Sequence, residues 1–229
     1  MVVSAIKHGI LVGRFVPGQR LMEADLRREH GLSRGPVREA MTRLAAEGVI
    51  AIGAHRGAYI RALTRTEVFN LLQVLKIIIG LAARLAAVRI EYGDNRIKLM
   101  AAFQRLEAEI AGADPIMLAI ERTRFYDTLF EVAGNPELAR INPVVAAQIL
   151  RVQVYGYLTN AEKLRQYADY RFLCDAILTG DARAAKRIVD LHLRRSRMHA
   201  QHLPDAAFAI PAGGTRRSIG SFSSGSSQR

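Results

Sequence analysis

Residues 30–50, HGLSRGPVREAMTRLAAEGVI, carry a hydrophobic pattern that predicts a short amphipathic helix. Apolar residues recur at intervals of three and four, which is the spacing of one helix face. They are Val37, Ala40, Met41, Leu44 and Ala45. Arg34 and Arg38 fall on the other side. The pattern therefore predicts a helix that buries one face and presents two arginines near its N-terminal end.

The residues around this helix indicate how it begins and what precedes it. Ser33 is a favoured N-cap residue, because its hydroxyl can accept a hydrogen bond from a backbone N–H of the first turn. Pro36 then falls in that turn, where a missing N–H costs little. Residues 22–30 are good helix formers, and Gly31 stands where a helix ends in a left-handed residue. Two helices joined by a three-residue turn predict a helix-turn-helix, whose second helix can enter the DNA major groove.

Two short β-prone runs follow, GVIAI and AYIRA, and the segment GAHRG joins them. This arrangement predicts a hairpin or wing after the second helix. The pattern alone leaves another interpretation open, because many small helical proteins contain two such helices with one charged, solvated face.

The longest apolar run, residues 71–88, is about as long as the ~20 residues that a bilayer-spanning helix needs. Its non-apolar residues follow at steps of three, four and four, so they share one narrow stripe. They are Gln73, Lys76, Gly80 and Arg84. We therefore interpret this run as a core helix that is also a candidate subunit interface, and we expect no membrane span.

The same periodicity predicts only helices in the rest of the chain. They cover about residues 94–111, 115–132, a helix reaching 157 that Pro143 kinks or breaks, 161–178, and 181–202 with Asp181 as its cap. The Gly/Ser-rich sequence beyond Pro204 predicts disorder. We expect three parts: a DNA-binding domain over 1–62, an all-helical domain over 63–203, and a disordered tail over 204–229.

Charge favours a polyanionic partner. The 33 basic and 21 acidic residues give a net charge of +12. Residues 1–62 hold 10 basic and 5 acidic residues, so basic density is highest where the helix-turn-helix is expected. The single cysteine, Cys174, excludes an intramolecular disulfide framework and fits a reducing cytoplasm. We interpret it as a small buried apolar residue. No nucleophile motif, phosphate loop or metalloprotease histidine pair supports an enzyme, and we expect no cofactor.

Three motifs in order, PGQRLMEADL, GLSRGPVREAMTRLAAEGVI and HRGAYI, resemble the winged-helix reader of the GntR family of bacterial transcription regulators. The helical remainder is similar to the FadR-type C-terminal effector domain through RFYDTLFEVAGNPEL, DYRFLCDAILTGDARAA and DLHLRRS. The resemblance covers roughly residues 5–200. It implies a mainly α fold, with an N-terminal winged helix-turn-helix followed by an all-α helical-bundle effector domain. It also implies a homodimer on a palindromic double-stranded DNA operator, in a family that usually represses.

The resemblance and the recognition helix together indicate which residues contact DNA. Arg34 and Arg38 are expected in the major groove, with at least one reading guanine. Ser33 and the first-turn backbone, at Gly35, are expected to hold a phosphate. In the wing, we expect Arg56 and Gly57 to contact backbone or minor groove.

Many relatives with this effector domain bind a divalent metal through an Asp or Asn and three histidines. The matching positions here are Arg122, Tyr126, Tyr170 and His192. A guanidinium has no lone pair for a metal, and phenols are poor ligands beside imidazole, so we expect no metal. His199 and His202, among arginines at a helix end, are interpreted as solvated.

Arg122 can instead supply positive charge directly, with a planar fork that suits a carboxylate or phosphate. Tyr126 lies four residues on, on the same helix face. We therefore expect a small anionic effector to bind Arg122, Tyr126, Tyr170 and His192, and to release a repressor from DNA. Two alternatives stay open: Arg122 pairs with an acidic neighbour, or the helical domain only dimerises and binds no effector.

Overall fold

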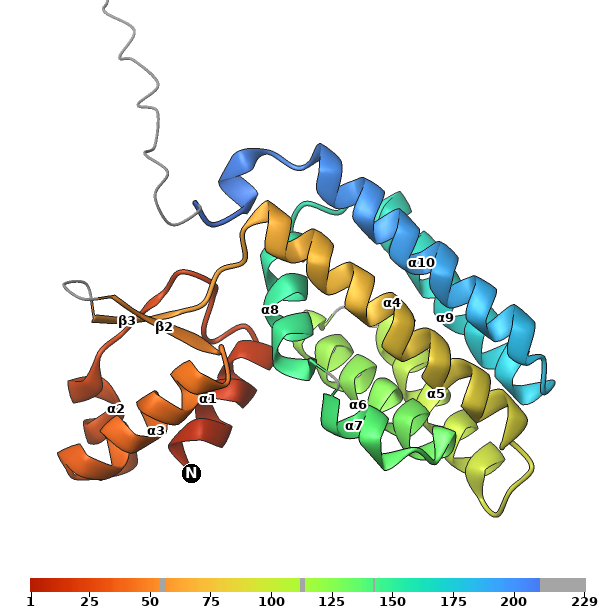
Figure 1. Ribbon diagram of the computed structural model, residues 1–229, viewed down its shortest axis with the longest axis horizontal. Helices are drawn as coiled ribbons and strands as arrows, with labels where there is room; N and C mark the ends of the chain where they lie inside the picture. Colours follow the sequence, from red (N-terminus) through yellow and green to blue (C-terminus); the bar gives the residue numbers. More distant parts are fainter. Residues whose placement is uncertain (54–56, 112–113, 142, 211–229) are drawn as a thin grey trace, which may run out of the picture.

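The computed structural model describes residues 1–53, 57–111, 114–141 and 143–210. It shows two parts: a small helix-and-sheet unit at the N-terminus and a larger bundle of helices (Figure 1). The mainly α fold predicted from the sequence is confirmed.

The N-terminal part contains three helices and a small sheet. In chain order these are α1 (Val2–Leu11), β1 (Arg20–Leu21), α2 (Glu23–His30), α3 (Arg34–Ala46), β2 (Ile50–Gly53) and β3 (Gly57–Ile60). The strand order is β1-β3-β2, and both pairings are antiparallel, with Ile50 opposite Ile60 and Arg20 opposite Tyr59. The predicted hairpin is therefore present as β2 and β3, whereas α1 and β1 were not anticipated.

The turn between α2 and α3 follows the sequence prediction in its backbone but not in its cap. Gly31 has a left-handed φ of 62° and ends α2. Ser33 is the N-cap residue of α3 with an extended backbone, yet its side chain makes no capping hydrogen bond. The expectation that the Ser33 hydroxyl caps the helix is wrong in this structure, so the hydroxyl and the first-turn N–H groups keep their bonding capacity for a ligand.

The C-terminal part consists of helices around α4 (Arg65–Val88). These are α5 (Asn95–Ala111), α6 (Pro115–Ala133), α7 (Pro136–Ile141), α8 (Val144–Tyr155), α9 (Asn160–Leu178) and α10 (Ala182–His202). Helix α4 runs through the middle of the bundle, with α9 and α10 on one side and α5 to α7 on the other (Figure 1). Helix α8 lies at the end that meets α1 of the N-terminal part.

Helix α4 begins six residues earlier than the apolar run suggested. Thr64 caps it, accepting a hydrogen bond from the Glu67 N–H, while the Glu67 carboxylate accepts one from the Thr64 N–H. This capping box satisfies two backbone donors at the helix start. Among the described helices, α4 alone is long and apolar enough to cross a membrane, and half of that apolar stretch is buried by neighbouring helices. Its packing against α6, α9 and α10 is that of a core helix.

Pro143 separates α7 from α8, so the single long helix expected to reach residue 157 is two helices, and the break suggested at the proline is present. Asp181 caps α10 as expected, accepting from the Ala184 N–H at 2.8 Å. Cys174 is buried, which raises the pKa of its thiol to about 12, consistent with a packing role.

The segment after α10 corrects one expectation. Residues 205–207 form a short 3₁₀ turn, and Leu203 and Ala207 are buried. The guanidinium of Arg65 donates to the backbone oxygens of Ala200, Gln201 and Leu203, and the Ala209 N–H donates to the Leu63 oxygen. The prediction of disorder from residue 204 onward is therefore wrong for residues 204–210, which pack against the start of α4. Residues 211–229 lie outside the described part.

Candidate nucleic-acid interface and internal cavity

The N-terminal end of α3 is exposed along the side that the sequence pattern assigned to DNA. Val37 and Leu44 are fully buried and anchor the helix against the N-terminal core. Ser33, Arg34, Gly35 and Arg38 are all exposed. The helix therefore presents its first turn and two guanidiniums to solvent, as an inserted recognition helix requires.

The two arginines of α3 differ in their partners. The Arg34 Nε donates to the Glu23 carboxylate of α2 at 3.1 Å, although the Arg34 side chain is 73% exposed. Arg38 is in no ion pair within the described ranges. Arg34 must therefore give up an exposed ion pair, worth little in water, before it can reach a base.

The wing is only partly described, since Arg56 lies outside the described residues. Gly57 opens β3 with a φ of +78°, a left-handed conformation that costs little only for glycine. The guanidinium of Arg20, on β1, lies beside Gly57, and Arg20 is exposed. Sequence reasoning missed Arg20 because a two-residue strand leaves no periodic pattern, and the pairing of β1 with β3 is what brings it to the wing.

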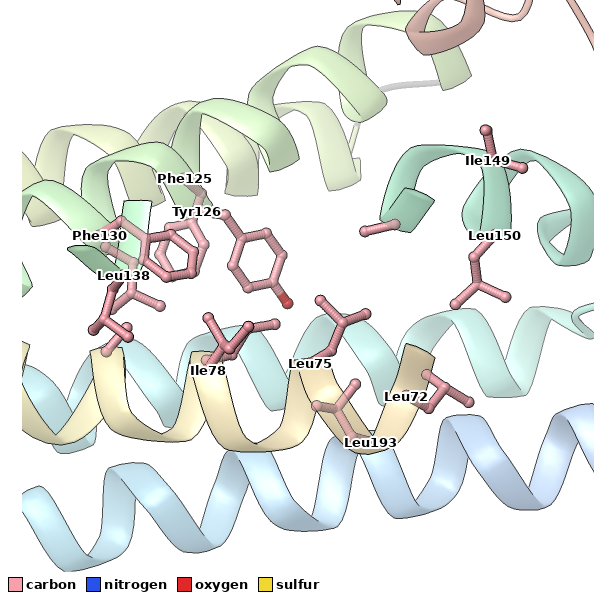
Figure 2. Close-up of a cluster of buried hydrophobic side chains, with 14 of the residues drawn as sticks. Leu72, Leu75, Ile78, Phe125, Tyr126, Phe130, Leu138, Ile149, Leu150 and Leu193 are labelled. Carbon is pink, nitrogen blue, oxygen red and sulfur yellow. The ribbon is translucent and has the colours of Figure 1, made fainter. Parts of the chain in front are cut away.

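The helical part contains a cavity of about 80 Å³ between α4, α6, α8, α9 and α10. Apolar residues from α4 and α8, such as Leu72, Leu75 and Leu150, form much of its wall. Figure 2 shows the Tyr126 hydroxyl pointing from α6 toward Leu75 and away from the Phe130 side of the core. Each of the four residues expected at an effector site lines this cavity: Arg122, Tyr126, Tyr170 and His192.

Arg122 is the most unusual of these residues. Only 7% of it is exposed, and in the described chain it forms no ion pair with a carboxylate. Its Nε is buried without a hydrogen-bond partner, and its guanidinium stacks 5.7 Å from the Tyr155 ring centre. The expected alternative, an acidic neighbour that neutralises Arg122, is not found among the described residues. A buried charge without a counter-ion is costly, which makes this residue a candidate for binding a ligand.

The two tyrosines bring hydroxyl groups to the cavity. The Tyr126 and Tyr170 hydroxyls lie 3.5 Å apart, and their rings meet edge to face. Burial raises the pKa of the Tyr126 hydroxyl well above its usual value, and the neighbouring Tyr170 raises it further. Tyr126 therefore keeps its proton at any physiological pH and can donate it in a hydrogen bond.

His192 is held in place by a buried carboxylate. Its Nδ1 lies 3.0 Å from Asp169 Oδ2, and Arg195 donates to the other oxygen of Asp169 at 2.6 Å. Because a carboxylate only accepts, Nδ1 carries a hydrogen; Nε2 is then an acceptor in the neutral ring and a second donor in the imidazolium, which is the form that can donate to an anion. Asp169 is 6% exposed and was not anticipated from the sequence.

These residues do not fit the divalent metal that the family resemblance implies. The guanidinium of Arg122 brings positive charge and no lone pair to this site, and the phenols of Tyr126 and Tyr170 beside it are poor ligands for a divalent metal. Within the described ranges, no three His, Cys, Asp or Glu side chains gather closely enough to bind an ion.

Two further cavity residues escaped the sequence analysis. Arg151, from α8, lines the cavity with its guanidinium 5.0 Å from the Tyr126 ring centre. His199, interpreted as solvated, instead lines the cavity: its Nδ1 lies 2.9 Å from Glu162, and its Nε2 is buried without a partner. Both were missed because packing between helices decides which side chains face the cavity, and local periodicity along one helix does not report that packing.

Comparison with known proteins places these features in a family. The model of "Bacterial regulatory proteins, gntR family" matches residues 1–60, and the FCD domain model matches residues 70–195. The chain is 27% identical over 202 residues to the "Probable D-xylose utilization operon transcriptional repressor" of Paenarthrobacter nicotinovorans, covering 86% of this chain and 84% of that protein. It is 31% identical over 129 residues to the "Nta operon transcriptional regulator" of Aminobacter aminovorans, covering 55% and 59%.

Solved structures share the fold. The E. coli protein McbR/YncC superposes with a TM-score of 0.73 at 17% identity, and a GntR regulator from Rhodococcus sp. RHA1 superposes with 0.74 at 20% identity. Each comparison covers 87% of this chain and 95% of the other. The arrangement of helices is thus common to these proteins.

Proposed function

This chain belongs to the GntR family, as a DNA-binding transcription regulator with a C-terminal FCD domain, and we propose that it is a cytoplasmic homodimeric repressor that a small anion releases from a palindromic operator. The relative from Paenarthrobacter nicotinovorans, which aligns with 86% of this chain, is named a probable transcriptional repressor, and this name supports repression over activation.

Buried, unpaired Arg122 is the observation that carries the effector proposal. The cavity combines its guanidinium with hydroxyl and imidazole groups from Tyr126, Tyr170 and His192. A carboxylate or phosphate there would accept two parallel hydrogen bonds from the guanidinium and neutralise its charge. The expected ligand is therefore a small anion, and no metal is needed to attract it.

The test is release of the purified protein from its operator DNA by small anions, measured by fluorescence anisotropy. A releasing anion should act on the wild type and on Arg140→Ala, which removes an exposed arginine paired with Glu137 on α7. Arg122→Ala should remain bound to DNA at the same anion concentration. If Arg122→Ala responds to the anion as the wild type does, the effector does not bind Arg122.

The DNA-contacting surface is proposed to consist of the N-terminal end of α3 and the wing. Exposed Ser33 and the backbone at Gly35 are placed to hold a phosphate, and Arg38 is free to read a guanine edge. In the wing, we assign Arg56 and Gly57 to backbone or minor groove, and exposed Arg20 is proposed to add a phosphate contact beside Gly57.

Dimerisation is proposed to use the outer face of α4. Val74, Ile77, Leu81 and Val88 recur on this face and are 48%, 68%, 37% and 65% exposed. A two-fold dimer would cover this apolar stripe and supply two DNA readers for a palindrome. A truncation that lacks residues 1–62 should sediment as a dimer at micromolar concentration, and a clean monomer would move the interface elsewhere.

The second candidate function is a DNA-binding dimer whose helical domain binds no effector. An enclosed, fully apolar core would favour it. The unpartnered polar atoms in the cavity, on Arg122 and His199, favour the effector-binding proposal instead.

A further inference from the structure

Arg122 is not the only cation at the cavity that lacks a carboxylate partner. Arg151 projects from α8, and no carboxylate of the described residues lies within ion-pair distance of either guanidinium. The two side chains stack in a crossed arrangement. Arg122 of α6 lies over Tyr155 of α8, and Arg151 of α8 lies over Tyr126 of α6.

Both guanidiniums act on the same small region. They are the two cations whose charges partly oppose the effect of burial on the pKa of the Tyr126 hydroxyl. A cavity of about 190 Å³ lies on the other side, between the end of α1 and helices α6 and α8. Arg122, Arg151 and Tyr155 line both cavities, so the guanidiniums form part of the wall between them.

Elsewhere in the described chain, buried carboxylates lie against arginines that are themselves about half exposed. Glu121 is 4% exposed, and it faces the guanidiniums of Arg105 and Arg124. Asp169, equally buried, faces Arg195. Within the described ranges, α6 and α9 thus supply carboxylates to these more exposed arginines, whereas buried Arg122 and half-buried Arg151 have none.

Two unpaired guanidiniums at one site carry two positive charges. A monocarboxylate neutralises one of them and leaves the other beside it, so that part of the mutual repulsion and desolvation cost persists. A compact anion with two negative charges neutralises both and can accept hydrogen bonds from both forks. The aromatic faces of Tyr126 and Tyr155 hold the two forks by cation–π contacts while no anion is bound.

We propose that Arg122 and Arg151 form a two-arginine clamp whose ligand is a compact dianion, either a dicarboxylate or a phosphate monoester. This rests on the proposed function, since it specifies the effector of the same cavity. The shared chemistry is two negative charges borne by a small molecule. The cavity of about 80 Å³ sets the scale of that molecule at a few carbon atoms.

The experiment compares matched anions by calorimetry on the full chain at pH 7.5 and constant ionic strength. The probes are butyrate and succinate, which have the same carbon chain with one or two carboxylates, and glycerol phosphate. The wild type should bind succinate or glycerol phosphate at least tenfold more tightly than butyrate. Whichever dianion binds more tightly identifies the source of the two charges.

The variants separate the two arginines. Arg151→Ala should reduce the preference for the dianion over butyrate to about one, while butyrate binding through Arg122 persists. Arg151→Lys, which keeps a point charge but not the fork, should retain an intermediate preference. Arg140→Ala is the matched control and should keep the wild-type preference.

The outcomes distinguish this inference from the function on which it rests. If butyrate and both dianions bind the wild type equally, or if Arg151→Ala keeps the full preference, the two-arginine clamp is refuted and an Arg122 site remains. If none of the three anions binds the wild type, both the clamp and the anion-binding function are refuted. Circular dichroism of each variant establishes that a lost preference is not a lost fold.

Discussion

The arginines at the tip of α3 and the arginines of the internal cavity are both suited to anions, but they meet water very differently. Arg34 is 73% exposed and rests on Glu23, whereas Arg122 is 7% exposed and has no carboxylate partner in the described chain. A solvated charge costs little to keep and is screened by salt. A buried one is expensive to keep and is screened little.

The contrast suggests how one chain distinguishes a polymer from a small molecule. The exposed arginines gain from many phosphates at once, through release of counter-ions and a field that extends over the surface. The cavity arginines are stabilised by a single bound anion, which supplies the hydrogen bonds and the negative charge that they lack when buried. Salt, mutation and pH should therefore affect the two sites by different amounts.

Salt should produce the largest difference. If the dimer contacts six to ten phosphates, raising NaCl from 50 to 200 mM should weaken operator binding by about 10³–10⁵-fold, because bound DNA has released its counter-ions. Anion binding in the cavity should weaken by less than about tenfold, because burial limits screening. Anisotropy and calorimetry over the same salt series measure both, and parallel slopes would contradict the contrast.

Within the DNA surface, Arg38 should matter more than Arg34. Arg38→Ala should cost about 1–3 kcal/mol of operator binding and relax preference at one base pair. Arg34→Ala should cost less, because Arg34 must first leave Glu23, and Glu23→Gln should strengthen binding slightly by freeing it. Operator titrations with single-base variants test this. Unchanged affinity and selectivity in both alanine variants would mean that α3 is not the recognition helix.

In the cavity, an apolar replacement should stabilise the ligand-free protein. Arg122→Met keeps similar bulk and removes a buried charge without a counter-ion; because apolar replacement of even a buried ion pair is often neutral or stabilising by about 1–4 kcal/mol, replacing this uncompensated charge should also be stabilising. At about 2–4 °C per kcal/mol for a chain of this size, the melting temperature should rise by a few degrees. Arg38→Met, on the surface, should leave it unchanged. A lower melting temperature for Arg122→Met would show that Arg122 already has a stabilising partner.

Acid should reveal the anchor of His199. Hydrogen bonds from Thr159, and then from His199, lower the pKa of Glu162 to about 2. Because the folded-state pKa lies below the unfolded value of about 4.3, the stabilisation is present above that value and is lost as the pH falls toward 2. Glu162→Gln should melt slightly below the wild type at pH 7, and thermal melts should converge between about pH 4.5 and 2. A constant difference over that range would exclude the charge as its cause.

Metal should have the smallest effect. With Arg122, Tyr126 and Tyr170 at three of the four positions that the family resemblance assigns to metal ligands, purified protein should contain no stoichiometric zinc, nickel or manganese by elemental analysis. Added metal should shift the melting temperature little, because stabilisation requires tight binding to the native state. One transition metal per subunit, bound through His192, would contradict this prediction.

The sequence predicted the exposed surface better than the interior, and the reason is physical. Helix α3 is governed by local signals, the 3.6-residue period and a glycine at the turn, which act within a few residues. Four cavity residues were also named, but only because the family resemblance aligned them. Arg151, His199 and Asp169 were missed because their partners lie on other helices, at separations that no local pattern records.

Local signals also misled where tertiary contacts decide. The Gly/Ser-rich composition predicted disorder from residue 204, yet Arg65 at the start of α4 fixes residues 203–205 through backbone and carboxylate contacts. The Ser33 hydroxyl was expected to cap α3, but only its backbone adopts the cap position. Both predictions described a local propensity correctly. Contacts from distant Arg65 overrode the first, and the second failed because the Ser33 hydroxyl makes no capping hydrogen bond.

The packing of residues 203–210 on the beginning of α4 has a topological consequence. Since the Ala209 N–H bonds the Leu63 oxygen, the helical domain begins and ends at one point on its surface. Adjacent ends are what circular permutation and domain insertion require. A short linker could therefore join residue 210 to residue 63, with new termini opened between α8 and α9, and the bundle with its cavity should still assemble. The helical domain could then be inserted into a loop of another protein, where anion binding in its cavity would control the activity of that host protein.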